Sequence, residues 1–169
     1  MRPGRFHIVV ALASGFCQPA MSQTASPAAA EQSFLDSLAG DWIMEGQVMG
    51  EPVRYRARGE RVLRGAWVEI RMTDVGATPP AYDARVYLGW DDRAHDYVVH
   101  WLDDSGAPGA RVAGLGNRAG DTLTIMFPYA SGTFRNRWIR SARGWRLVAD
   151  AQQPDGSWRN FGDLTARRP

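Results

Sequence analysis

The chain has 169 residues, of which 20 are basic, 18 are acidic and 44% are hydrophobic. This length suits one domain with a hydrophobic core. The formal net charge is only +2, so the chain lacks the clear basic excess that is typical of nucleic-acid-binding proteins.

The first 22 residues have the pattern of a secretory signal peptide. Arg2 and Arg5 form a basic start, and residues 8–16 are an unbroken run of apolar and small residues. That run is shorter than the roughly 20 apolar residues that cross a bilayer, and the small residues Ala20 and Ser22 offer a cleavage site. We therefore expect cleavage near Gln23, a periplasmic or secreted protein, and no transmembrane segment in the mature chain.

Cleavage changes both the charge and the cysteine content. Loss of residues 1–22 leaves 18 basic against 18 acidic residues and removes Cys17, the only cysteine. The mature chain then has neither a disulfide nor a thiol nucleophile. A lipid-modified Cys17 is disfavoured because the bulky Phe16 precedes it. We expect a flexible leader at 23–32 and a single domain at 33–169.

From residue 33 onward the sequence predicts one short helix and ten strands. The helix is expected at 33–38, where Phe34, Leu35 and Leu38 fall on one side. Runs rich in β-branched and aromatic residues, separated by turn residues, predict the strands. We place the strands at 42–49, 53–63, 66–73, 81–90, 96–103, 110–117, 122–127, 133–141, 144–152 and 157–166.

Short turns between strands of similar length predict an up-and-down meander. Arg64-Gly65, Arg143-Gly144 and the 154–157 segment each place glycine where a positive φ angle costs little. A Greek-key sandwich needs long crossover connections, and closing a meander into a barrel removes its exposed edges. We therefore expect an all-β fold, a single antiparallel up-and-down barrel of about ten strands with a short N-terminal helix.

Four segments resemble a known family. They are residues 38–42 (LAGDW), 62–68 (VLRGAWV), 87–91 (YLGWD) and 101–105 (WLDDS). The first is similar to the Gly-x-Trp opening of lipocalin-like barrels, and all four together resemble a bacterial lipocalin-like family of uncharacterised exported domains. The resemblance spans residues 34 to about 165. It implies a barrel in which Gly40 and Trp42 are structural residues, Trp42 closing the bottom, and it brings no agreed activity.

The sequence predicts no cofactor and no metal. A neighbouring group of lipocalin-like barrels binds haem through a histidine late in the chain, whereas the last histidine here is His100. His95 and His100 lack the spacing of a zinc site. The aspartates at 91–92, 96 and 103–104 lack the register of a calcium-binding loop, so turn capping explains them better.

Tyr87, His100 and Arg137 are the candidate ligand contacts. His100 lies in the middle of a strand, and both faces of that strand are mostly apolar, so the sequence leaves open whether it points inward. Arg135 and Arg137 share one face of the 133–141 strand. They either hold a carboxylate or phosphate head group inside the barrel or form surface charge outside it.

The inner face is easier to assign in the 53–63 strand. Arg54, Arg56 and Arg58 alternate there with apolar or aromatic residues, which predicts a solvated outer face. Seven tryptophans are distributed over most of the predicted strands. This tryptophan content is typical of a pocket that binds an apolar ligand and orients it with a few polar groups.

Three functions follow from this reading. The first is a periplasmic binding module whose barrel takes a small apolar or amphipathic molecule, since no Gly-x-Ser-x-Gly, Walker or dinucleotide motif is present. The second is a small enzyme in which His100, inside the barrel, performs acid–base chemistry. The third is an envelope interaction protein with an exposed apolar patch and no small ligand. The sequence leaves the oligomeric state open.

Overall fold

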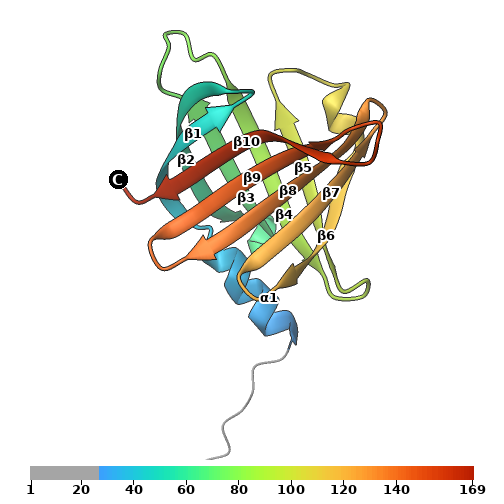
Figure 1. Cartoon of the computed structure of the whole chain (residues 1–169). Coiled ribbons are helices and arrows are strands. Elements are labelled where there is room, and N and C mark those ends of the chain that lie inside the picture. Colours follow the sequence, from blue (N-terminus) through green and yellow to red (C-terminus); the bar gives the residue numbers. More distant parts are fainter. Residues whose placement is uncertain (1–26) are drawn as a thin grey trace, which may run out of the picture.

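The computed structural model describes residues 27–169, which form one α-helix, ten β-strands and two short 3₁₀ turns (Figure 1). The predicted signal peptide and the first residues of the predicted leader lie outside the described residues. The elements are α1 (Pro27–Asp36), β1 (Gly40–Val48), β2 (Glu51–Val62), η1 (Leu63–Gly65), β3 (Trp67–Asp74), β4 (Asp83–Asp91), β5 (Asp96–Asp103), η2 (Gly109–Arg111), β6 (Ala113–Ala119), β7 (Thr122–Tyr129), β8 (Gly132–Ser141), β9 (Gly144–Gln152) and β10 (Trp158–Arg167).

Every strand pairs with its neighbours in the sequence, and the sheet closes on itself. The order around the barrel is β1-β10-β9-β8-β7-β6-β5-β4-β3-β2, with all pairs antiparallel. The closing pair, β1 with β10, runs from Ile43 opposite Arg167 to Val48 opposite Gly162. The predicted antiparallel up-and-down barrel with a short helix is therefore confirmed, and each predicted strand overlaps an observed one.

The helix begins six residues earlier than the sequence suggested. α1 spans Pro27–Asp36, so residues 27–32 are helical rather than a loose leader. Proline is favoured at the first helical position, and the three alanines that follow it are the strongest helix formers. No helix in the described part of the chain is long and apolar enough to cross a membrane.

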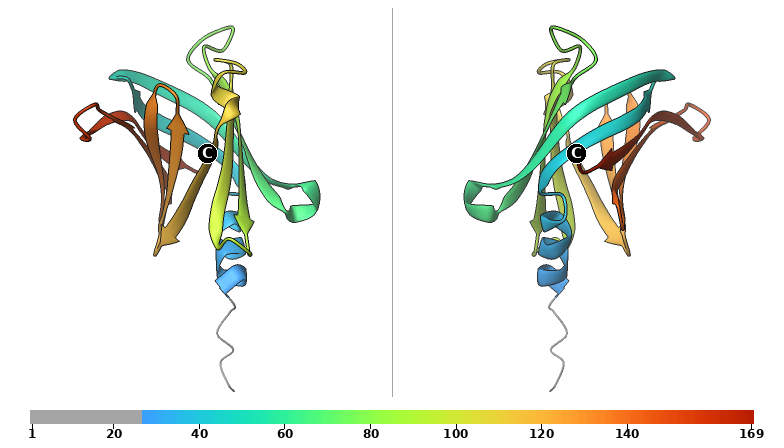
Figure 2. Two further views of the ribbon diagram at one scale, coloured as in Figure 1. Left: turned by 90° about the vertical axis from the view of Figure 1, so that its right-hand side faces the viewer. Right: turned by 90° about the vertical axis from the view of Figure 1, so that its left-hand side faces the viewer.

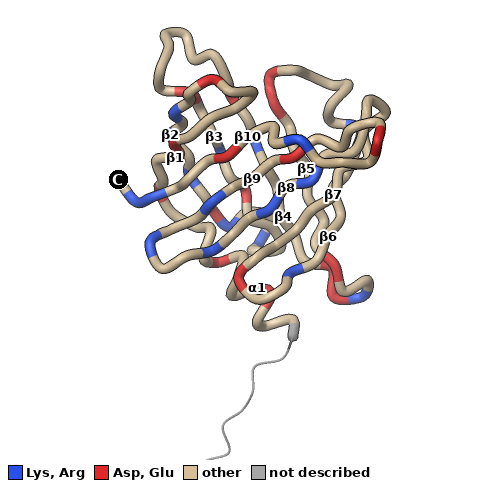
Figure 3. Tube along the Cα trace, in the orientation of Figure 1, with Lys and Arg blue, Asp and Glu red and all other residues tan. Residues whose placement is uncertain are grey.

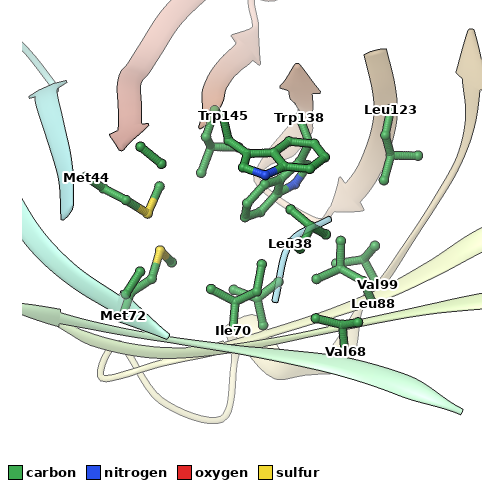
Figure 4. Packing of buried hydrophobic residues seen from close by; sticks show 14 of the residues in the cluster. Leu38, Met44, Val68, Ile70, Met72, Leu88, Val99, Leu123, Trp138 and Trp145 are labelled. Atoms are coloured by element: carbon green, nitrogen blue, oxygen red, sulfur yellow. The ribbon is translucent and has the colours of Figure 1, made fainter. Parts of the chain in front are cut away.

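One end of the barrel is filled by a hydrophobic core. Tyr97, Phe34, Leu35 and Leu38 have some of the largest fully buried side chains. Figure 4 shows side chains from opposite walls pointing toward one another around Leu38, with Trp138 and Trp145 among them. Because this core sits at the end that α1 covers, we call that end the floor and the opposite end the mouth (Figure 2).

Tryptophan side chains bind the end of α1 to the floor. The Trp42 Nε1–H donates to the carbonyl oxygen of Leu38 at 3.0 Å, and the Trp145 Nε1–H donates to that of Ser37 at 3.0 Å. Phe34 packs edge-on against Trp145, with ring centroids 5.2 Å apart. These contacts satisfy carbonyl groups that the end of a helix would otherwise leave without partners.

Gly40 lets the chain turn from the helix into β1. Its φ angle is +110°, a conformation that glycine adopts with little strain. A side chain at this position would overlap the guanidinium of Arg168. Arg168 instead lies over the Trp42 ring at 3.7 Å and donates to the Ala39 carbonyl oxygen at 2.9 Å, so the last strand helps to hold the first.

A second anchor holds the beginning of α1. Glu31 accepts two hydrogen bonds from Arg118, both at 2.6 Å, and one from the Tyr97 hydroxyl at 2.5 Å. The side chains of Arg118 and Glu31 are only 18% and 15% exposed. The hydrogen bonds from Arg118 lower the pKa of the Glu31 carboxyl from its ordinary value, against the opposing effect of burial. The helix is thus tied to β5 and β6.

Candidate functional site

The mouth half of the barrel contains a cavity of about 630 Å³, within the range of about 300–1,000 Å³ typical of small-molecule sites. Its walls come from β1, β2, β3, β5, β7, β8, β9 and β10 and from the loops at the mouth. The aromatic lining residues are Tyr55, Tyr82, Trp101, Phe127, Tyr129, Phe134 and Phe161. Apolar side chains therefore dominate the walls, as in sites that bind apolar ligands.

Aromatic side chains of β7, β8 and β10 contact one another along one wall of the cavity and form what we call the aromatic belt. Tyr129 stacks on Phe127 at 5.7 Å and meets Phe134 edge-on at 5.9 Å. Phe134 in turn meets Phe161 edge-on at 5.3 Å. Edge-on and stacked contacts of this kind add to the stability of the packing, so the belt holds its shape without a ligand.

The wall between β5 and β6 is incomplete near the mouth. These strands pair only from Tyr97 opposite Gly116 to His100 opposite Ala113. Beyond His100, β5 has no partner in β6, and the loop of residues 104–112, which contains η2, lies there instead. This loop contributes Pro108, Arg111 and Val112 to the cavity lining. One side of the site is consequently built from loop rather than strand.

A chain of hydrogen bonds lines the upper part of the cavity. The Trp101 Nε1–H donates to the Tyr82 hydroxyl at 3.0 Å, and that hydroxyl donates to Asp103 Oδ2 at 3.4 Å. Asp103 also accepts from the backbone N–H of Ser105 at 3.1 Å and from its hydroxyl. Burial, and then the nearby Asp103 charge, raise the pKa of Tyr82 well above its ordinary value, so its hydroxyl stays neutral at physiological pH.

Asn136 is a mostly buried polar side chain of the cavity wall to which no described residue gives a hydrogen bond. It is 8% exposed and lines the cavity from the inner face of β8. Its amide forms no hydrogen bond among residues 27–169. Phe134 and Trp138 flank it on the same face, and Ile125 and Ala149 stand opposite it on the neighbouring strands. The amide therefore meets only apolar walls and the cavity itself.

Tyr87, His100 and Arg137 do not line this cavity. The Tyr87 hydroxyl donates to Glu69 Oε1 at 2.9 Å on the outer wall. His100 stands opposite Tyr87 on β5, exposed, with its ring 5.8 Å from that of Trp67. The two residues expected as candidate ligand contacts therefore lie outside this cavity, because the face of β5 that carries Tyr97 is the one that points inward.

Arg137 also points outward. Arg137 and Arg135 both donate to Asp150 Oδ2, at 3.0 and 2.9 Å, and Arg135 stacks over the Trp158 ring at 4.3 Å. The alternative in which these arginines are surface charge is therefore the observed one. Figure 3 shows basic and acidic residues interspersed over the outside of the barrel. The ion pair with Asp150 explains the outward position of Arg137, and no ligand inside the barrel is needed to explain it.

The interior offers no histidine to an enzyme. Of the residues that the structure describes, His95 and His100 are the histidines, and both are exposed. Within the same residues, no group of three or more histidine, aspartate and glutamate side chains is arranged to hold a metal ion. Acid–base catalysis by a histidine inside the barrel therefore has no support in residues 27–169.

Sequence reasoning did not single out several polar residues that line the cavity, among them Tyr82, Trp101, Asp103 and Asn136. One signal was present for Asn136. It lies between Phe134 and Trp138 on a face that is otherwise aromatic, and a single amide on such a face marks a polar group in an apolar wall. For Tyr82, just before β4 begins, the sequence carried no comparable signal.

Together these features define a class of protein: a closed, ten-stranded antiparallel β-barrel with a core at one end and an aromatic cavity at the other. Comparison with protein families finds no family model that matches the chain, and comparison with curated proteins finds no similar sequence.

Proposed function

We propose that this protein is a binding module that holds one small, mainly apolar or amphipathic molecule in the mouth half of its barrel. The observation that carries the proposal is the cavity of about 630 Å³ with an aromatic belt. A barrel that served only as a scaffold would be filled with side chains from end to end. The signal-peptide pattern of residues 1–22 supports a function outside the cytoplasm, and the resemblance of the sequence to lipocalin-like barrels supports a binding function.

The binding energy would come mainly from burial of apolar ligand surface. Each buried methylene contributes about 0.8 kcal/mol, which corresponds to roughly a fourfold change in affinity. Within a series of linear ligands, affinity should therefore rise by about that factor per carbon and level off when the chain fills the cavity. A surface that binds detergents without specificity would show no such levelling.

The direct test is native mass spectrometry of the mature protein, purified from the cell envelope without refolding. We expect a reproducible additional mass that disappears on denaturation, and its value identifies the molecule. A bare polypeptide mass, together with no affinity for any linear ligand of eight to fourteen carbons, would contradict the proposal and favour the interaction protein without a ligand.

A cavity-filling variant links binding to this cavity. Ala149 lies on the inner face of β9 and lines the cavity, so Ala149→Phe should abolish the additional mass by occupying its space. Thr165→Phe is the matched control, because Thr165 is exposed on the outer face of β10. Circular dichroism should show the same β-sheet spectrum for both variants. Retention of the ligand by Ala149→Phe would place the binding site elsewhere.

A further inference from the structure

Asn136 has an amide whose hydrogen bonds the protein does not satisfy. Buried polar side chains nearly always have a partner, and one without a partner costs about 1–3 kcal/mol. Asn136 is 8% exposed and lines the cavity. Trp138, two residues further along the same face, has an Nε1–H that is also buried and without a partner. Of these two side chains, Asn136 is the one that lines the cavity, so its amide offers hydrogen bonds to whatever fills it.

The surroundings of Asn136 are suited to an uncharged group. Its neighbours across β7 and β9 are Ile125 and Ala149, and none of its neighbours on the inner wall carries a charge. A carboxylate or an ammonium at this depth would be desolvated without a counter-ion, which costs far more than an uncharged polar group does. An amide offers both a donor and an acceptor, so a hydroxyl or a carbonyl can bond to it.

The mouth does not favour an anion either. Asp103 lines the cavity, and its charge acts with burial to raise the pKa values of Tyr82 and Tyr129. The negative charge therefore reaches the hydroxyls around the upper cavity. Among residues 27–169, Arg111 is the only cationic side chain in the lining, and it is exposed on the loop of residues 104–112. A carboxylate ligand would meet Asp103 as well as Arg111.

We propose that the cavity selects an apolar molecule carrying one uncharged hydrogen-bonding group, a hydroxyl or a carbonyl, which bonds to the Asn136 amide. This inference rests on the proposed function and specifies the class of ligand. The apolar part of the molecule lies along the aromatic belt toward the mouth, and its polar group points inward. Specificity comes from the amide, since a ligand without the polar group leaves it unsatisfied.

The test uses three probes of nearly equal size: decan-1-ol, undecane and decanoate. Decan-1-ol and undecane have the same number of non-hydrogen atoms, so they differ in one hydroxyl. Each is titrated into the mature wild-type protein at neutral pH while the fluorescence of its tryptophans is followed, because Trp101 lines the cavity. We expect decan-1-ol to bind about 3- to 10-fold more tightly than undecane, and decanoate to bind more weakly than decan-1-ol.

Asn136→Leu, a change that preserves the size of the side chain, tests the residue itself. The affinity for decan-1-ol should fall about 3- to 10-fold, to that for undecane, while undecane binds no more weakly than to the wild type. Asn117→Leu is the matched control, because Asn117 is exposed on β6, and it should leave all affinities unchanged. If Asn136→Leu does not fold, the preference of the wild type for decan-1-ol over undecane still tests the proposed class of ligand.

The other outcomes separate this inference from the proposed function. Equal affinity of the wild type for decan-1-ol and undecane would overturn the role of Asn136 and leave a purely apolar carrier. Tightest binding of decanoate, lost in Arg111→Gln, would overturn it in favour of an anionic head group at the mouth. If none of the three probes binds and native mass spectrometry shows only the mass of the polypeptide, both proposals are overturned.

Discussion

Asn136 contributes to binding and to stability in opposite senses. In the empty barrel no described residue bonds to its amide, so replacement by an apolar side chain of similar size removes the cost of a mostly buried, unsatisfied polar group. We expect Asn136→Leu to raise the free energy of unfolding by about 1 kcal/mol, measured by urea denaturation of the ligand-free protein. Asn117→Leu, on the outside, should change it by no more than about 0.5 kcal/mol. A clear loss of stability in Asn136→Leu would indicate that ordered water already satisfies the amide.

Single residues also show where the sequence could predict whether a side chain points inward or outward. Arg54, Arg56 and Arg58 alternate with apolar residues, and all three are exposed as expected, because desolvation of a row of guanidinium groups is too costly. His100 had no such constraint. Both faces of its strand are apolar, and only packing against the opposite wall determines that Tyr97 points inward. The residues of the candidate site could not be assigned without knowing which face of this strand points inward.

At the scale of elements, α1 acts as a plug that ionic contacts hold in place. The pKa of Glu31 is lowered in the folded protein, so its stabilising effect is fully present above its ordinary value of 4.5 and is lost as the pH falls through the lower, folded value. Glu31→Gln should lower the free energy of unfolding by about 2 kcal/mol at pH 7, as expected for hydrogen bonds to charged groups.

The pH dependence provides the check on this prediction. In urea denaturation at several pH values, the difference between the wild type and Glu31→Gln should be constant near neutrality and shrink once the pH falls below about 4.5. Glu45→Gln is the matched control: its pair with Arg54 is 58% and 59% exposed, and such pairs contribute at most about 1 kcal/mol. Equal effects of both variants would show that Glu31 does not anchor the helix.

The sequence indicated that a helix precedes the first strand, but not its full length. The apolar periodicity that predicts a helix begins only at Phe34. The earlier residues of α1 are instead favoured by Pro27 and the alanines, and they are held in place by the ion pair of Glu31 with Arg118. That contact joins residues 87 positions apart. Long-range ion pairs of this kind leave no local pattern, so the anchored beginning of α1 could not be predicted.

For the whole molecule, the barrel was predictable because each hairpin is local. Turn glycines and strand lengths specify neighbouring pairs, and a meander of ten such strands buries its edges only by closing. The division into a filled floor and a hollow mouth was not predictable. It depends on which inner side chains reach the axis, and that depends on contacts across the barrel rather than along it.

The incomplete pairing of β5 and β6 makes one side of the barrel the weakest. We expect the amides of residues 104–112 to exchange with deuterium much faster than those in the fully paired β8 and β9, as measured by mass spectrometry of peptides. Decan-1-ol should slow exchange in this loop, which lines the cavity, and should leave the 119–121 turn at the floor unchanged. Uniform protection around the barrel would contradict this prediction.

Both described ends of the chain lie on the side of the barrel away from the mouth. α1 begins below the floor (Figure 1), and Arg168, next to the last residue, bonds to Ala39 at the end of the helix. A tether attached at either end therefore leaves the mouth facing solvent. The protein can be immobilised on a sensor surface, or fused to a reporter, through either end without obstructing the path of a molecule into the barrel.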